Sequence, residues 1–69
     1  RWMGVVMVMT VGEAIKQFRP IKIEVRVGKG LKIVANILTK EGATHADLIA
    51  EKHVKLISMI NSYLILEGV

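Results

Sequence analysis

Apolar and charged residues alternate along residues 20 to 38, and a Gly-Lys-Gly segment interrupts the alternation at residues 28 to 30. This pattern is typical of two strands that each have one buried and one solvated face, joined as a β-hairpin. A three-residue loop at residues 28 to 30 predicts the pairs Val27 with Leu31, Val25 with Ile33, Ile23 with Ala35, and Ile21 with Ile37. One face of the hairpin would therefore form a wall of the core.

The other face of this hairpin is predicted to be basic, because successive side chains of a strand point to opposite sides of the sheet. Its residues would be Lys22, Glu24, Arg26, Lys32 and Val34, with Lys29 at the tip. The same segment would thus supply both a core wall and a charged surface.

Residues 2 to 10 are apolar and β-branched without alternation, as in a strand that is covered on both faces. We expect a central strand or a seam between subunits here. Met3, Met7 and Met9 would fill irregular gaps in the core.

A short helix is predicted over residues 11 to 19. Thr10 is the expected N-cap, and Glu13, three residues later, would complete a capping box. Pro20 would end the helix and force an extended entry into the hairpin. The predicted buried stripe consists of Val11, Ala14, Ile15 and Phe18.

A long helix is predicted in the last third of the chain. Residues 39 to 43 are a polar break, and residues 44 to 47 have the pattern of a second N-terminal cap. Apolar residues then recur at helical spacing, in a stripe made of Ile49, His53, Leu56, Ile57, Ile60, Tyr63 and Leu64. A helix of about 20 residues is roughly 30 Å long, which exceeds the length of the predicted strands. We therefore expect part of it to pack on a second subunit.

The predicted fold class is α+β: one small β-α-β-β-α domain over residues 1 to 69, with the antiparallel hairpin packed under the long C-terminal helix. One alternative stays open, because residues 31 to 38 also fit a helix that ends at Gly42, and residues 53 to 69 could then form two strands. The chain starts at Arg1 rather than at a methionine, which leaves open that it is a fragment or lacks upstream residues.

Size and composition favour an oligomer. A chain of 69 residues lies near the lower limit for independent folding, and without cysteine it has no disulfide to stabilise it. Since 52% of the residues are hydrophobic, we expect apolar surface to be buried between subunits, most simply in a homodimer. The predicted interface residues are Val6, Val8, Ile57, Ile60, Tyr63 and Leu64.

The sequence also favours a cytoplasmic protein. No apolar run reaches the roughly 20 residues that a membrane-spanning helix needs. The lack of a cysteine framework is more typical of cytosolic than of secreted small proteins.

The net charge is +4, and the excess of positive charge is local. Glu24 is the only acidic residue between residues 16 and 32, where the basic residues are Lys16, Arg19, Lys22, Arg26, Lys29 and Lys32. A concentrated basic patch attracts phosphates, whereas scattered lysines mainly provide solubility. Because no aromatic residue is interleaved with these residues in the hairpin, we expect contacts to the phosphates of duplex DNA or structured RNA rather than base stacking.

No motif identifies an enzyme. The Gly-Lys-Gly segment lacks the remaining residues of a phosphate-binding loop and is better explained as a turn. His45 and His53 would diverge by about 80° on a helix, so they would not share a metal ion. We therefore expect no catalytic residue, no metal and no cofactor, although an active site shared between subunits stays open.

The leading hypothesis is a small basic homodimer that binds nucleic acid through the hairpin's basic face, contacting phosphates with little sequence specificity. The alternative is a structural or adaptor subunit that binds no nucleic acid. It would assemble into a homo-oligomer through its apolar first strand and its C-terminal helix. An enzyme is the least favoured of the three classes.

Overall fold

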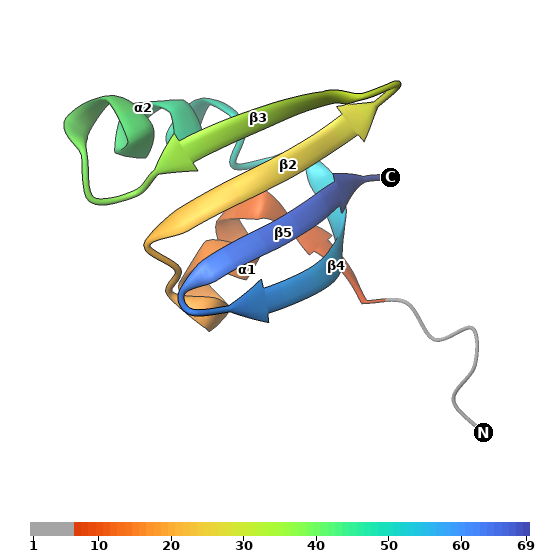
Figure 1. The fold of residues 1–69 in the computed structure, drawn as a ribbon, viewed down its shortest axis with the longest axis horizontal. Coiled ribbons are helices and arrows are strands. Elements are labelled where there is room, and N and C mark those ends of the chain that lie inside the picture. The colour runs from red at the N-terminus through yellow and green to blue at the C-terminus, as the bar shows by residue number, and fades with distance from the viewer. Residues whose placement is uncertain (1–6) are drawn as a thin grey trace.

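The computed structural model describes residues 7–69, which form strands and two short helices in the order β1-α1-β2-β3-α2-β4-β5 (Figure 1). Their bounds are β1 Val8–Thr10, α1 Val11–Phe18, β2 Lys22–Gly28, β3 Leu31–Asn36, α2 Lys40–Leu48, β4 His53–Ile60 and β5 Tyr63–Gly68. Part of the predicted first strand, including Met3 and Val6, lies outside the described residues.

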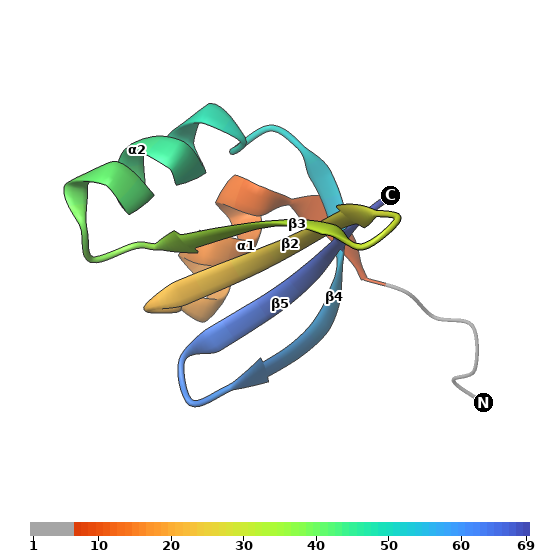
Figure 2. The same cartoon turned by 45° about the horizontal axis from the view of Figure 1, so that its top comes forward.

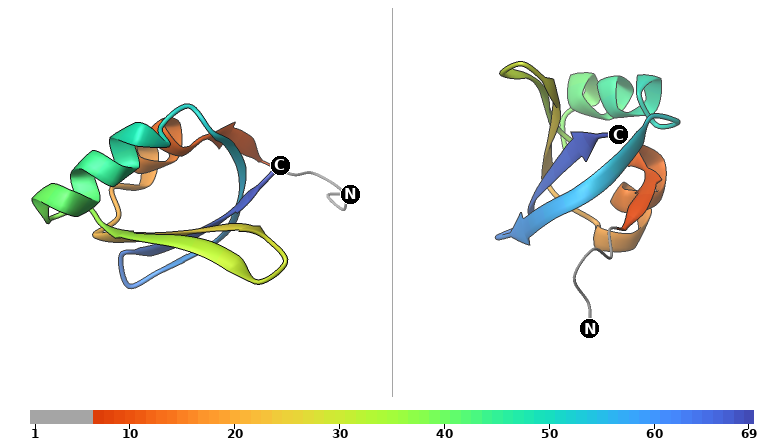
Figure 3. Two further views of the ribbon diagram at one scale, coloured as in Figure 1. Left: turned by 90° about the horizontal axis from the view of Figure 1, so that it is seen from above. Right: turned by 90° about the vertical axis from the view of Figure 1, so that its right-hand side faces the viewer.

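The strands form one mixed sheet with the order β1-β4-β5-β2-β3. Neighbouring strands are antiparallel except for β2 and β5, which run parallel. Two register shifts, one in β2 between Arg26 and Gly28 and one in β4 between Leu56 and Ser58, mark β-bulges, which bend a strand. Figures 2 and 3 show the resulting curved sheet, with both helices on its concave side.

The core lies between the concave face of the sheet and the two helices. Side chains of β2 and β5 form its centre, and small residues of the helices close it. Its buried members are Met9, Val11, Ala14, Ile23, Val25, Ala35, Ala46, Val54, Leu64 and Leu66.

The structure confirms the first helix and its caps. The Thr10 hydroxyl accepts a hydrogen bond from the Glu13 amide at 3.1 Å, and the Glu13 carboxylate accepts one from the Thr10 amide at 2.8 Å. Arg19 ends the helix in the left-handed conformation, with φ of 50°. Val11 and Ala14 are buried, as predicted, because this side of the helix rests on the core.

The predicted first strand is much shorter in the described part of the chain. β1 lies at the edge of the sheet and pairs only with β4. Val8 is 52% exposed, so this segment is not a central strand covered on both faces.

The hairpin of β2 and β3 is confirmed in its centre and differs at its tip. Val25 pairs with Ile33, and Ile23 pairs with Ala35, as the alternation predicted. At the tip, Gly28 pairs with Leu31, so the loop contains two residues rather than three, and the bulge takes up the extra residue. Leu31 is consequently 67% exposed instead of lying in the core. Because residues 31–36 form a strand, the helical alternative for residues 31 to 38 is excluded.

The predicted long C-terminal helix is wrong: the segment forms the antiparallel hairpin of β4 and β5. The open alternative of two strands in residues 53 to 69 is confirmed, although the helix at residues 31 to 38 that accompanied it is not. Asn61 and Ser62 form its turn, with φ of 53° and 64°. Two consecutive residues with positive φ are typical of a type I′ hairpin turn and cannot continue a helix. On β4 the apolar residues that reach the core are Val54, Leu56 and Met59, and on β5 they are Leu64 and Leu66. The apolar residues thus alternate as in a strand, and the bulge displaces this alternation by one residue. The displaced pattern resembles the spacing of apolar residues on a helix.

The second helix, α2, begins before the predicted cap at residues 44 to 47. Thr39 is its N-cap, and its hydroxyl accepts a hydrogen bond from the Gly42 amide at 2.9 Å. Gly42 lies directly against the backbone of Asn36, and a Cβ at this position would overlap the Asn36 carbonyl oxygen. The glycine that looked like part of a polar break therefore lets α2 pack tightly on the end of β3.

A glycine substitution in the turn between β4 and β5 should have the opposite effect on stability from the one it would have in a helix. Ser62→Gly is expected to raise the free energy of unfolding by about 0.5–1 kcal/mol, because glycine adopts positive φ without the steric cost of a side chain. Urea denaturation of the variant and the wild type measures this difference.

The matched control is Ser58→Gly, inside β4, where glycine should lower stability by about 0.5–1 kcal/mol. A lower stability of Ser62→Gly would argue against the turn, since glycine destabilises the interior of a helix.

Candidate nucleic-acid interface

The side of the sheet that faces away from the core and the helices is here called the outer face. Strand alternation and the observed register place on it Lys22, Glu24 and Arg26 of β2, Lys32 and Val34 of β3, Lys55, Ser58 and Ile60 of β4, and Tyr63, Ile65 and Glu67 of β5. The outer face therefore combines charged residues with one aromatic and several aliphatic side chains.

Glu24 is the central residue of the outer face. It is only 7% exposed, although it lies on the side of the sheet away from the core. Its carboxylate accepts hydrogen bonds from the Tyr63 hydroxyl and from Nε of Arg26, the latter at 3.1 Å. The ammonium group of Lys32 lies 3.9 Å from the same carboxylate. Glu24 thereby connects β2 with both neighbouring strands.

These partners control the ionisation of Glu24 and Tyr63. The hydrogen bond from Tyr63, followed by that from Arg26, holds the pKa of Glu24 below its ordinary value of 4.5, against a smaller opposing effect of burial. The same bond to an ionised carboxylate raises the pKa of Tyr63 above its ordinary value of 10. Near neutral pH the pair is therefore a carboxylate and a protonated phenol.

The structure brings four of the six predicted basic residues together. Lys22, Arg26 and Lys32 lie on the outer face, and Lys29 lies in the turn of the β2–β3 hairpin. Arg26, Lys29 and Lys32 also line a shallow hollow at the hairpin tip, together with Glu24, Glu67, Leu31 and the two turn glycines. Cations and carboxylates thus meet at this end of the sheet.

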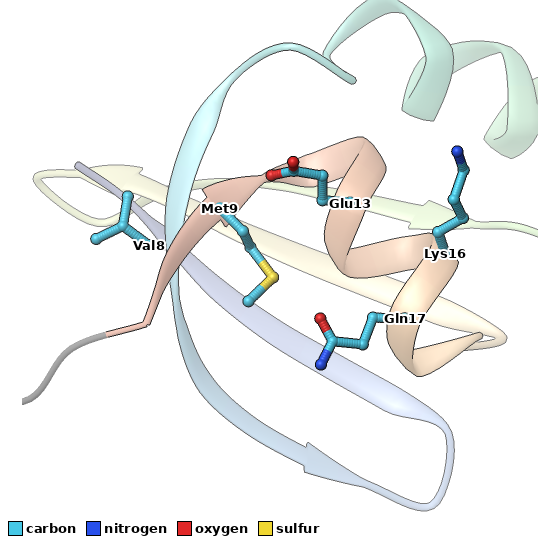
Figure 4. Close-up of a pocket in the computed structure, with 5 residues that line it drawn as sticks. All are labelled: Val8, Met9, Glu13, Lys16 and Gln17. Atoms are coloured by element: carbon cyan, nitrogen blue, oxygen red, sulfur yellow. The ribbon is translucent and has the colours of Figure 1, made fainter.

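The other two predicted basic residues, Lys16 and Arg19, belong to α1 and its C-terminal end, on the concave side of the sheet. Lys16 lines a separate hollow, shown in Figure 4, between α1 and β1. Its other lining residues are Val8, Met9, Glu13 and Gln17. Lys16 is therefore separated from the outer face by the sheet itself.

The predicted interface residues do not share one surface. Val8, Ile57 and Ile60 are exposed, on the paired strands β1 and β4. Tyr63 is half-buried beside Glu24, and Leu64 is completely buried in the core of the chain itself. Leu64 is therefore not available to a partner, and the interface itself stays a prediction.

Sequence reasoning missed all the outer-face residues of β4 and β5, among them the charged and aromatic residues Lys55, Tyr63 and Glu67. Lys55 and Glu67 form an ion pair of 3.8 Å across β4 and β5. The polar Asn61-Ser62 pair between two β-branched and aromatic segments favours a hairpin and could have predicted β4 and β5, but not the pairing of β5 with β2.

The charged groups of the outer face and of the hairpin tip are mostly cationic. Lys22, Arg26, Lys29, Lys32 and Lys55 outnumber Glu24 and Glu67, and the Arg26 side chain is half exposed. Within residues 7–69, no group of three or more His, Cys, Asp or Glu residues could hold a metal ion. No helix in this part of the chain is long and apolar enough to cross a membrane.

Comparisons of the chain with models of protein families, with curated proteins and with solved structures gave no match.

The Tyr63–Glu24 bond predicts how stability depends on pH. Because the pKa of Glu24 is lower in the folded than in the unfolded chain, its contribution is complete above pH 4.5 and is lost as the pH falls through the folded-state pKa. Tyr63→Phe removes the largest cause of this shift, so the pKa of Glu24 should rise towards its ordinary value. The stability difference between wild type and variant should shrink on acidification, and again above pH 10 as Tyr63 ionises.

Carboxyl NMR titration of Glu24 and urea denaturation across pH measure these two effects. Ser58→Ala, also on the outer face, is the control and should leave the Glu24 titration unchanged. An unchanged pKa of Glu24 in Tyr63→Phe would show that the phenol does not hold the carboxylate.

Proposed function

We propose that this domain binds nucleic acid through the outer face of the β2–β3 hairpin, contacting phosphates with little sequence specificity. The observation that carries the proposal is the gathering of Lys22, Arg26, Lys29 and Lys32 in the β2–β3 hairpin. Phosphate contacts by Lys and Arg supply most of the affinity in non-specific nucleic-acid binding.

The cations differ in how free they are to bind a phosphate. Arg26 and Lys32 share the carboxylate of Glu24, whereas Lys22 and Lys29 take part in none of the ion pairs among residues 7–69. The contact of Arg26 with Glu24 uses Nε, which leaves the two terminal guanidinium nitrogens to an incoming anion. We infer that Lys22 and Lys29 are the main phosphate ligands and that Arg26 and Lys32 support them.

A homodimer would double this surface. Formation of the dimer and a cytoplasmic location both stay predictions.

The second candidate function is assembly of a homo-oligomer without nucleic acid. It is supported by the exposure of Val8, Ile57 and Ile60 on the edge pair of β1 and β4, with Ile60 66% exposed. In that case Ile60→Glu should convert an oligomer into a monomer, as measured by light scattering.

The phosphate proposal predicts a defined loss in the double variant Lys22→Gln/Lys29→Gln. Each phosphate contact contributes about −0.9 to the slope of log affinity against log salt concentration on duplex DNA. Loss of two contacts should reduce the slope by about 1.8 and weaken binding about sixtyfold at 0.1 M salt. Fluorescence anisotropy with labelled DNA and RNA across a salt series measures both quantities.

The matched control is Lys16→Gln/Lys40→Gln, which removes the same charge from α1 and α2 on the concave side. It should retain the wild-type slope. Equal losses in both variants would mean that net charge alone drives binding, and absence of binding by the wild type at low salt would refute the proposal.

A further inference from the structure

A second hollow opens on the outer face at the end of the sheet opposite the hairpin tip. It is lined by Ile21, just before β2, by Lys22, the first residue of β2, by the turn residues Asn61 and Ser62, and by Tyr63 at the start of β5. The amides of Ile21 and Lys22 both donate to the Ser62 carbonyl oxygen, at 2.8 and 3.2 Å. These bonds fix the two walls relative to each other.

The chemistry of this hollow is that of a nucleobase site. Tyr63 provides an aromatic ring, Asn61 and Ser62 provide side-chain donors and acceptors, and Lys22 provides a positive charge at the rim. The hydrogen bond from the Tyr63 hydroxyl to Glu24 restrains the ring, so little side-chain entropy would be lost when a base stacks on it. Every base offers a π-face, which makes such stacking tolerant of sequence.

We propose that this hollow binds one base of a single-stranded nucleic acid, stacked on Tyr63 with the adjoining phosphate on Lys22. The inference rests on the proposed function and narrows its partner from nucleic acid in general to a single strand. A base inside a duplex is already stacked between its neighbours, so only an unpaired base can lie flat on Tyr63.

The position of the hollow agrees with the path of a bound strand along β2. Lys22 and Arg26 are four residues apart on one strand face, a distance of about 13 Å at roughly 3.3 Å per residue. A strand that begins on Tyr63 and Lys22 and runs along β2 would therefore meet Arg26 next and Lys29 at the hairpin tip. The base site would fix one end of the strand, and the basic residues would follow its backbone.

The test compares an oligothymidylate with an abasic chain of the same length, which has the same phosphates and no bases. At equal salt, the wild type should bind the oligothymidylate about tenfold more tightly than the abasic chain. Tyr63→Leu should abolish this preference, so that the variant binds the oligothymidylate and the abasic chain with equal affinity. Tyr63→Phe should retain it within about threefold, because the ring is kept and only the bond to Glu24 is lost.

A direct readout does not depend on the variants. The chain has one tyrosine, so its ring signals in NMR spectra are unambiguous. They should shift upfield when oligothymidylate is added and stay in place with the abasic chain. This measurement keeps the test decisive if Tyr63→Leu fails to fold.

Equal binding of both chains with unshifted ring signals would overturn the base site and leave phosphate binding in place. Binding of neither chain would overturn the proposed function as well. A preference for oligothymidylate that survives in Tyr63→Leu would place the base elsewhere and also refute this inference.

Discussion

The hydrogen bond from Tyr63 to Glu24 crosses the parallel pair β2 and β5, where two separate hairpins become one sheet. A carboxylate that is almost completely covered must keep its partners, because an unpaired buried charge is costly. Tyr63, Arg26 and Lys32 supply them from three neighbouring strands. On the other side of the same pair, Ile23 and Leu64 lie next to each other in the core. The junction is thus fixed by polar contacts on one face and apolar contacts on the other.

The contacts of Glu24 divide the basic residues of the hairpin into two groups. The positive charges are not equivalent, because Glu24 compensates those in the middle of β2 and leaves those at its ends. Arg26 is half exposed and contacts Glu24 through Nε, so its terminal guanidinium nitrogens can bind a phosphate while the contact with Glu24 is kept. A carboxylate between the binding positions nevertheless repels a phosphate placed directly over it. If the outer face binds nucleic acid as proposed, an anionic chain with spaced charges would therefore fit it better than a compact polyanion.

Local signals in the sequence were sufficient for the first half of the fold. The capping box of Thr10 and Glu13, the stop at Pro20 and the pairing of Val25 with Ile33 depend on residues close in sequence, and they were predicted correctly. The second half was predicted as a helix because a bulge in β4 displaces the strand alternation by one residue, so that apolar residues recur at nearly helical intervals. The pairing of β2 with β5 joins distant segments and has no local signature. For this reason the role of Tyr63 on the outer face could not be derived from the sequence.

The connectivity of the sheet also has a consequence for how the chain folds. Each hairpin joins neighbouring segments through a two-residue turn, whereas the contact of Glu24 with Tyr63 spans 39 positions in the sequence. Closing so long a loop costs conformational entropy before the contacts on either face can repay it. Both hairpins can therefore form early as local units, and their docking along β2 and β5 should limit the rate. The β4–β5 hairpin, whose strand β4 carries the exposed aliphatic residues Ile57 and Ile60, would then wait for β2 during synthesis and refolding, when its unpaired edge is open to association with other chains.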